Sequence, residues 1–178
     1  EPCVLAMDDD ALRRTDALRT DMEFFYGPNQ KIPPPSRSTK KYVNRILQVA
    51  KDRPVLLLAH QYTRYLGDLF GGQMMSGMAR KSLNLEEEGG GGVAFYNFPK
   101  LGSTTTKDFI TAWYSKLNNL DLTSEEKQDI VDEANLVFAL NIEILEELDG
   151  SAWNAFWTIA WKSFRENMAS IASNDNQR

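Results

Sequence analysis

The chain has 178 residues, of which 42% are hydrophobic and 25% are charged, a composition that excludes a disordered or fibrous protein and fits one globular domain. It carries 25 acidic and 20 basic residues, for a net charge of −5. This balance argues against nucleic acid as the main partner, because phosphate binding requires a concentrated basic face.

Apolar residues recur at helical spacing along most of the chain, and no segment has the alternating pattern of a β-strand. The first predicted helix covers residues 8–26 and ends at Gly27-Pro28. A loop with prolines at 33–35 follows, and Ser38 is then expected to cap a second helix.

Pro54 suits the first turn of the next helix, where proline gives up only an N–H group that has no helical partner. This helix is predicted to run from about Val55 through the glycines near residue 70, and residues 74–83 continue it after a bend. The connector at residues 86–92, EEEGGGG, is expected to be mobile.

Two helices are predicted after the connector. The first covers residues 108–120. Thr123, with Glu126 three residues later, forms a capping box that opens a long helix ending at Leu148. The whole pattern predicts an all-α fold.

The C-terminal region is predicted to contain one more helix, residues 152–164, which is rich in tryptophan but too short to span a bilayer. A disordered polar tail follows at 173–178, so that a single domain occupies residues 1–172. Cys3 is the only cysteine, which favours a reducing compartment over secretion. We therefore expect a soluble intracellular protein.

Residues 59–73, AHQYTRYLGDLFGGQ, hold most of the candidate chemistry. Thr63, Gly67 and Gly71 recur every four residues and therefore form one strip on a helix. Two glycines inside a helix cost roughly 1 kcal/mol each relative to alanine, so another interaction must offset them. The strip either packs against a second helix, which the spacing alone favours, or lets a flat macrocycle approach the backbone.

His60, Arg64 and Asp68 form a second line at the same spacing. Arg64 and Asp68 form either an ordinary intrahelical ion pair or part of a site in which the carboxylate holds a proton-relaying water. The spacing does not decide between these two interpretations. His60 is the only histidine, and a lone histidine is more often structural than a metal ligand.

The same run resembles the distal-helix signature of the heme oxygenases, A-H-x-Y-T-R-Y-L-G-D-L-x-G-G-Q, which leaves only two of its fifteen positions open. Residues 24–28, 93–98 and 130–150 are similar to further segments of that family, so the likeness covers about residues 12–150. The resemblance implies a single-domain, multi-helical heme-oxygenase-like bundle with a glycine-kinked distal helix.

The resemblance also implies an enzyme that uses O2 and electrons to cleave heme to biliverdin, CO and ferrous iron, with heme as both cofactor and substrate. Asp68 would hold the distal water that delivers protons, and Arg64 would support it. The cofactor-binding residues would be Tyr62, Thr63, Gly67, Gly71, Phe138 and Asn141. Electrons would come from a separate ferredoxin or flavoprotein reductase, and the protein would be a monomer of the cytoplasm or a plastid.

Four features depart from the family pattern. The family's axial histidine lies ahead of Glu1, so the chain is expected to be N-terminally incomplete, and no metal ligand is assigned, His60 included. Phe70 stands in place of a small serine, Tyr114 aligns with a propionate-binding arginine, and Ser76-Gly77 replaces a lysine pair.

These departures leave two alternatives to the enzyme. One is a non-catalytic relative of the same fold that binds heme or another tetrapyrrole, or that has a regulatory role. The other is a helical interaction domain without a ligand, in which the glycine strip contacts another helix.

Overall fold

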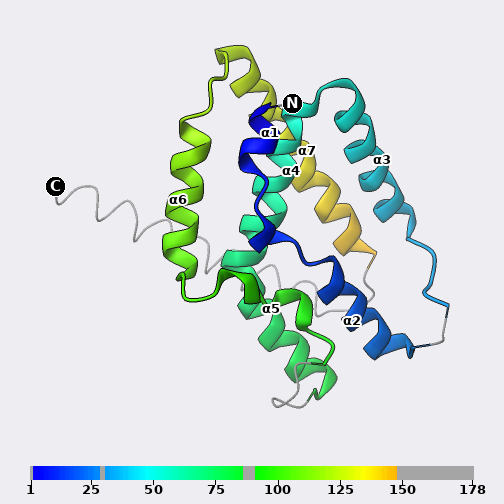
Figure 1. Cartoon of the computed structure of the whole chain (residues 1–178). Coiled ribbons are helices and arrows are strands. Elements are labelled where there is room, and N and C mark those ends of the chain that lie inside the picture. The colour runs from blue at the N-terminus through cyan, green and yellow to red at the C-terminus, as the bar shows by residue number, and fades with distance from the viewer. Residues whose placement is uncertain (1, 29–30, 86–90, 148–178) are drawn as a thin grey trace.

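The structure is a computed structural model that describes residues 2–28, 31–85 and 91–147. These residues form a bundle of helices without a β-strand, which confirms the all-α prediction for this part of the chain (Figure 1). The helices are α1 (Pro2–Met7), α2 (Thr15–Tyr26), α3 (Arg37–Asp52), α4 (Leu57–Gln61), α5 (Gly67–Leu83), α6 (Thr106–Asn118) and α7 (Ser124–Glu146). The short turns are η1 (Asp10–Leu12), η2 (Pro54–Leu56), η3 (Tyr62–Leu66), η4 (Ala94–Tyr96) and η5 (Pro99–Leu101).

The predicted helix over residues 8–26 is wrong in its first half. The Asp9 side chain accepts a hydrogen bond of 3.0 Å from the backbone N–H of Ala11, which closes the single turn η1. Aspartate competes in this way with regular helix formation. Arg13 is extended, with φ −79° and ψ 118°, so the continuous helix α2 begins only at Thr15.

The cap of α3 is Ser36 rather than the predicted Ser38. Ser36 Oγ accepts a hydrogen bond of 3.1 Å from the backbone N–H of Thr39. Ser36 follows the prolines and has the extended backbone that an N-cap requires. Ser38 lies inside the helix, where its N–H donates to the Glu147 side chain at 2.9 Å.

The central helical segment runs from η2 through α4, η3 and α5, and it begins at Pro54 as predicted. It changes direction between α4 and α5 (Figure 1). The irregularity lies in η3, which is a π-helical turn, whereas α5 is regular from Gly67 to Leu83. The bend was predicted after the glycines and occurs ahead of them, because a π turn widens the hydrogen-bonded ring and redirects the helix.

The core lies between the central segment and the helices around it. Its main cluster consists of Met7, Leu12, Val49, Val55, Leu56, Leu58, Leu66, Leu69, Ile110 and Trp113. A smaller cluster joins α3 to α7 through Tyr42, Val137 and Leu140. The central segment is thus held on both sides, and this fixes its orientation toward α7.

The capping box at the start of α7 is confirmed. Thr123 Oγ1 accepts from the N–H of Glu126 at 3.1 Å, and Glu126 Oε2 accepts from the N–H of Thr123 at 2.8 Å. Helix α6 begins two residues before its predicted start, because Thr105 caps it. The predicted helix end at Leu148, the helix at 152–164 and the tail lie outside the described residues, as do residues 86–90 of the connector.

Candidate functional site

Gly67 and Gly71 lie on an open face of α5. A Cβ atom built on either glycine would meet no atom within 4 Å among the described residues. A helix packed against the strip would supply such atoms, so the helix-packing interpretation is not supported in this part of the chain. Gly72 differs, since its Cβ would lie 3.0 Å from Cδ1 of Tyr96. Gly72 therefore lets η4 approach the helix, whereas Gly67 and Gly71 leave room for a ligand.

Two phenylalanines, one on α5 and one on α7, are exposed. Phe70, on α5, is 64% exposed, and Phe138, which lies one turn before Asn141 on α7, is 54% exposed. The hydroxyl of Thr63 is buried and has no hydrogen-bond partner among the described residues. Exposed large apolar side chains and an unpaired buried hydroxyl are each features found at binding surfaces. The open glycines and Thr63 therefore suit one face of a flat macrocycle.

Asp68 points into the protein and pairs with Arg14, which the sequence analysis missed. Arg14 Nη2 lies 2.6 Å from Asp68 Oδ2, and the two residues are only 6% and 8% exposed. Arg14 Nη1 also donates to the backbone oxygen of Phe95 at 2.9 Å. The partner of Asp68 is thus an arginine 54 positions away and not the arginine one turn earlier on its own helix.

Aromatic rings surround the Arg14 guanidinium group. Its Cζ lies 4.0 Å from the ring centroid of Phe95, 4.3 Å from that of Phe98 and 5.5 Å from that of Tyr65. Cation–π attraction at such distances stabilises a desolvated cation. Arg14 is therefore fixed in orientation by rings as well as by hydrogen bonds.

The turn that carries Phe95 is itself held by a buried carboxylate. Asp21, on α2, accepts hydrogen bonds of 2.8 Å from the N–H groups of Ala94 and Phe95. A carboxylate that accepts two backbone N–H bonds satisfies donors at the start of the turn. Asp21 thus fixes the position of η4 and, through Phe95, the position of Arg14.

Arg64 connects the central segment to α7. Its Nη1 donates a hydrogen bond of 2.7 Å to Oδ1 of Asn141, and Nδ2 of Asn141 donates to the backbone oxygen of Val137 at 2.7 Å. The structure therefore joins Arg64 to Asn141, two of the predicted site residues. Arg64 and Asp68 have different partners, and the simple intrahelical ion pair considered for them does not form.

Tyr62 and Tyr114 bring their hydroxyl groups to 3.4 Å from each other. Tyr114 lies on α6 at the position where the family resemblance leads us to expect an arginine. Burial, together with the contact to Tyr62, raises the pKa of Tyr114 well above its ordinary value. Tyr114 is thus a neutral hydrogen-bonding group at physiological pH.

His60 is bonded to a carboxylate in the interior. Its Nε2 lies 3.0 Å from Oε1 of Glu133, and Glu133 also forms an ion pair with Arg45. Burial lowers the pKa of His60, although the Glu133 contact opposes this, so the neutral ring donates its Nε2–H to the carboxylate. This nitrogen is therefore engaged by Glu133.

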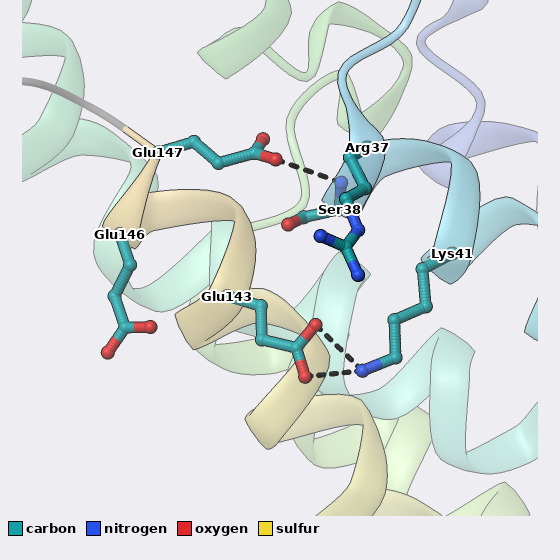
Figure 2. Close-up of a pocket in the computed structure, with 6 residues that line it drawn as sticks. All are labelled: Arg37, Ser38, Lys41, Glu143, Glu146 and Glu147. Carbon is teal, nitrogen blue, oxygen red and sulfur yellow. Dashed lines mark hydrogen bonds and ion pairs between the residues drawn. The ribbon is translucent and has the colours of Figure 1, made fainter.

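A different hollow of about 440 Å³ lies between the start of α3 and the end of α7 (Figure 2). It is lined by Arg37, Ser38, Lys41, Glu143, Glu146 and Glu147. Lys41 Nζ lies 2.5 and 2.8 Å from the two carboxylate oxygens of Glu143. Exposed pairs of this kind contribute little free energy, and none of the lining residues belongs to the predicted site. The hollow is a helix–helix junction and offers no catalytic arrangement.

Sequence reasoning missed Arg14 and Asp21 because no local pattern connects them to the glycine strip. They are seven residues apart, in a segment that also contains Asp16 and Arg19, so their charge alone does not distinguish them. Their partners, Asp68 and the turn at Ala94–Tyr96, lie 54 and more than 70 positions away. Only the fold brings these groups together.

The chain is similar to known proteins over most of its length. A family model described as heme oxygenase matches residues 1–147. Heme oxygenase 1 of Bos taurus is 46% identical over 140 residues, covering 78% of this chain and 47% of that protein. The heme oxygenase of Porphyra purpurea is 42% identical over 141 residues, covering 79% of this chain and 58% of that protein.

A solved structure has the same fold. It is the crystal structure of heme oxygenase-1 from the cyanobacterium Synechocystis sp. PCC 6803 in complex with heme. It matches with a TM-score of 0.76 and 36% identity, and the match covers 90% of this chain and 71% of that one. The chain spans about half the length of the mammalian relatives that it matches.

Proposed function

The chain belongs to the heme oxygenase family, and from this membership we propose that it takes part in the O2- and electron-dependent cleavage of heme to biliverdin, CO and ferrous iron. The observation that carries the proposal is the open surface at Gly67 and Gly71 next to the Asp68 carboxylate. Heme would supply both the iron that binds O2 and the carbon that is oxidised.

The glycine strip would form the floor of the site. Without side chains at Gly67 and Gly71, the plane of a macrocycle can approach the backbone of α5 closely. Thr63 lies one turn earlier on the same segment, and its unpaired hydroxyl would gain a partner from the ligand or a bound water. Tyr62 would meet an edge of the macrocycle, with Tyr114 beside it. Phe138 would cover apolar ligand surface from α7.

Asp68 would act as the proton relay. A carboxylate that is mostly buried and fixed by an ion pair can hold a water molecule at a defined position and pass protons through it. Arg64 and Asn141 would hold α7 against the central segment, so that the distance from Phe138 to the strip stays constant. We therefore propose Asp68 and Arg64 as the catalytic residues.

The iron ligand is not assigned to any described residue. His60 is committed to Glu133, and the described ranges contain no group of three or more side chains that could hold a metal ion. The bound iron would be that of heme, and a separate ferredoxin or flavoprotein reductase would supply electrons. No helix within the described residues is long and apolar enough to cross a membrane. We propose one domain over residues 1–172 and a soluble monomer of the cytoplasm or a plastid.

A second candidate function is a non-catalytic protein of the same family that binds heme or another tetrapyrrole. Two observations favour it. Phe70 presents a large ring at 64% exposure beside Gly71, which can narrow the site, and Tyr114 is a neutral side chain at a position expected to carry a positive charge. Both changes affect ligand geometry more directly than they affect the proton relay.

Heme titration followed by absorbance, with ascorbate and O2 added afterwards, separates the two functions. The enzyme yields biliverdin from the bound heme, and Asp68→Ala abolishes this yield while heme still binds. The matched control is Asp121→Ala, which changes an exposed aspartate in a loop. Binding without biliverdin, in a protein that also carries the segment expected ahead of Glu1, favours the non-catalytic function. Wild-type biliverdin production by Asp68→Ala would contradict the role of Asp68.

A further inference from the structure

We propose that Arg14 is a positioning residue for Asp68, which fixes the orientation of the carboxylate that follows Gly67 in the glycine strip. This inference rests on the proposed function, because it gives Arg14 a role only through the relay carried by Asp68. Arg14 itself would not touch the ligand or the reacting atoms.

The first support is the geometry of the pair. Arg14 Nη2 and Asp68 Oδ2 lie 2.6 Å apart, and the side chains are 4% and 11% exposed. Solvent screens such a pair weakly, so each charge depends on the other for compensation. The arginine is the more buried of the two, so the exposure that remains belongs mainly to the carboxylate.

The second support is that Arg14 cannot easily turn to another partner. Its second nitrogen donates to the backbone oxygen of Phe95, and the rings of Phe95 and Phe98 lie within 4.3 Å of the guanidinium carbon. Asp21 fixes the backbone of this turn through two hydrogen bonds. The planar guanidinium group is thus held by hydrogen bonds at Nη1 and Nη2 and by aromatic rings near its carbon. Its orientation defines the direction from which it binds Asp68.

The third support is that Arg64, the other candidate cation, is engaged elsewhere. Arg64 donates to Asn141 on α7, whereas Arg14 reaches Asp68 across the fold. Arg14 also uses only one of its nitrogens on only one carboxylate oxygen, Oδ2. This arrangement is compatible with a water molecule bound to Oδ1. Because a buried ion pair is a weak source of stability compared with apolar packing, the pairing points to control of the carboxylate.

The contact is tested first in the heme-free protein by a double-mutant cycle of Arg14→Met and Asp68→Asn, with urea unfolding as the measurement. We expect the double variant to lose less stability than the sum of the two single variants, because each single change leaves a buried group without its partner. Arg13→Met is the matched control, since Arg13 is adjacent and 60% exposed. Additive losses would overturn the pairing.

The positioning role is tested in the heme-loaded protein. Arg14→Met is expected to lower the biliverdin yield by at least about tenfold, a general acid–base effect, while heme affinity stays unchanged. In the Asp68→Asn background the same change is expected to have no further effect, and Arg14→Lys should restore part of the yield. An equal factor in both backgrounds, or a wild-type yield from Arg14→Met, would overturn the inference.

These outcomes are separable from failure of the proposed function. If the unmutated protein, with the segment expected ahead of Glu1, binds heme but makes no biliverdin, the enzymatic proposal fails. The Soret maximum of the heme complex then decides the role of Arg14. Arg14→Met should displace that maximum in the same direction as Asp68→Asn, and the double variant should show no additional displacement. A Soret band that Asp68→Asn displaces and Arg14→Met leaves unchanged would overturn the inference.

Discussion

Arg64 and Asn141 join the central helical segment to α7 through a hydrogen bond of 2.7 Å between Nη1 and Oδ1. The amide of Asn141 is oriented by its second bond, from Nδ2 to the backbone oxygen of Val137. Its oxygen is therefore presented to the guanidinium group. Phe138 follows Val137 directly on α7, so this bond lies in the turn of the helix that carries an exposed aromatic ring.

Replacing Asn141 with leucine should lower the free energy of unfolding by about 1 kcal/mol, because Arg64 loses its acceptor while the helix keeps its length. Urea unfolding measures the loss. Asn135→Leu is the matched control, since Asn135 is exposed on the same helix. Equal losses from the two variants would show that the contact with Arg64 contributes nothing.

Gly71→Ala should separate stability from ligand binding. The added Cβ meets no atom of the described residues, so helix propensity raises the free energy of unfolding of the heme-free protein by about 0.5–1 kcal/mol. The same methyl group occupies the open strip, and heme affinity should fall. Gly77→Ala, on another face of the same helix and equally open, should raise stability and leave heme affinity unchanged. Unchanged heme affinity in Gly71→Ala would place the ligand elsewhere.

The burial of His60 predicts a loss of stability in mild acid. Burial lowers the pKa of His60 below its ordinary value of 6.5, so below pH 6.5 the unfolded chain takes up a proton that the folded protein does not. Stability is therefore complete above pH 6.5 and falls as the pH drops. Burial raises the pKa of Glu133, but hydrogen bonds from Arg45 and His60 outweigh it and lower the pKa overall. Its contribution is lost at still lower pH, below about 4.5.

His60→Gln tests this pH dependence, because glutamine keeps a donor for Glu133 but does not titrate. Between pH 5 and 6.5 the slope of the unfolding free energy against pH should decrease, by at most about 1.4 kcal/mol per pH unit for one proton. The measurement is a series of urea titrations at several pH values. Because His60 is the only histidine in the chain, an unchanged slope would mean that its folded pKa is not lowered.

Asp21→Asn should destabilise the protein by about 2 kcal/mol. One carboxylate oxygen becomes an amide NH2 group, which faces a backbone N–H of Ala94 or Phe95 and leaves that donor unpaired. Thermal or urea unfolding measures the change. Asp16→Asn, on the exposed side of the same helix, should change stability by less than about 1 kcal/mol. If both variants behave alike, the turn at η4 does not depend on Asp21.

Much of the fold follows from local signals in the sequence. The capping box of Thr123 and Glu126 predicted the start of α7 correctly, because both of its partners lie within three residues. Pro54 likewise predicted the start of the central segment. The predictions failed where two local options compete. Asp9 closes its own short turn ahead of α2, and Ser36 caps α3 in place of Ser38.

The candidate site was only partly predictable. The spacing of the glycines predicted the strip. Whether another helix covers the strip depends on the tertiary arrangement, which the spacing does not determine. Arg64 and Asp68 are one turn apart, and the spacing rule therefore offered an ion pair between them. Their actual partners, Asn141 and Arg14, are 77 and 54 positions away, and no periodic pattern within a single helix records such distances.

The π turn at Tyr62–Leu66 sets the rotational phase of everything that follows it. Closing a ring from residue i to i+5 instead of i+4 takes up one additional residue, which delays the rotation of the helix by roughly the 100° that one residue contributes. His60, before the turn, is directed at Glu133, whereas Asp68, after it, is directed at Arg14. If this turn were a regular helix with the same number of residues, Asp68 and the glycines would be rotated by about that 100° and different side chains would reach the open face, even though the sequence was unchanged.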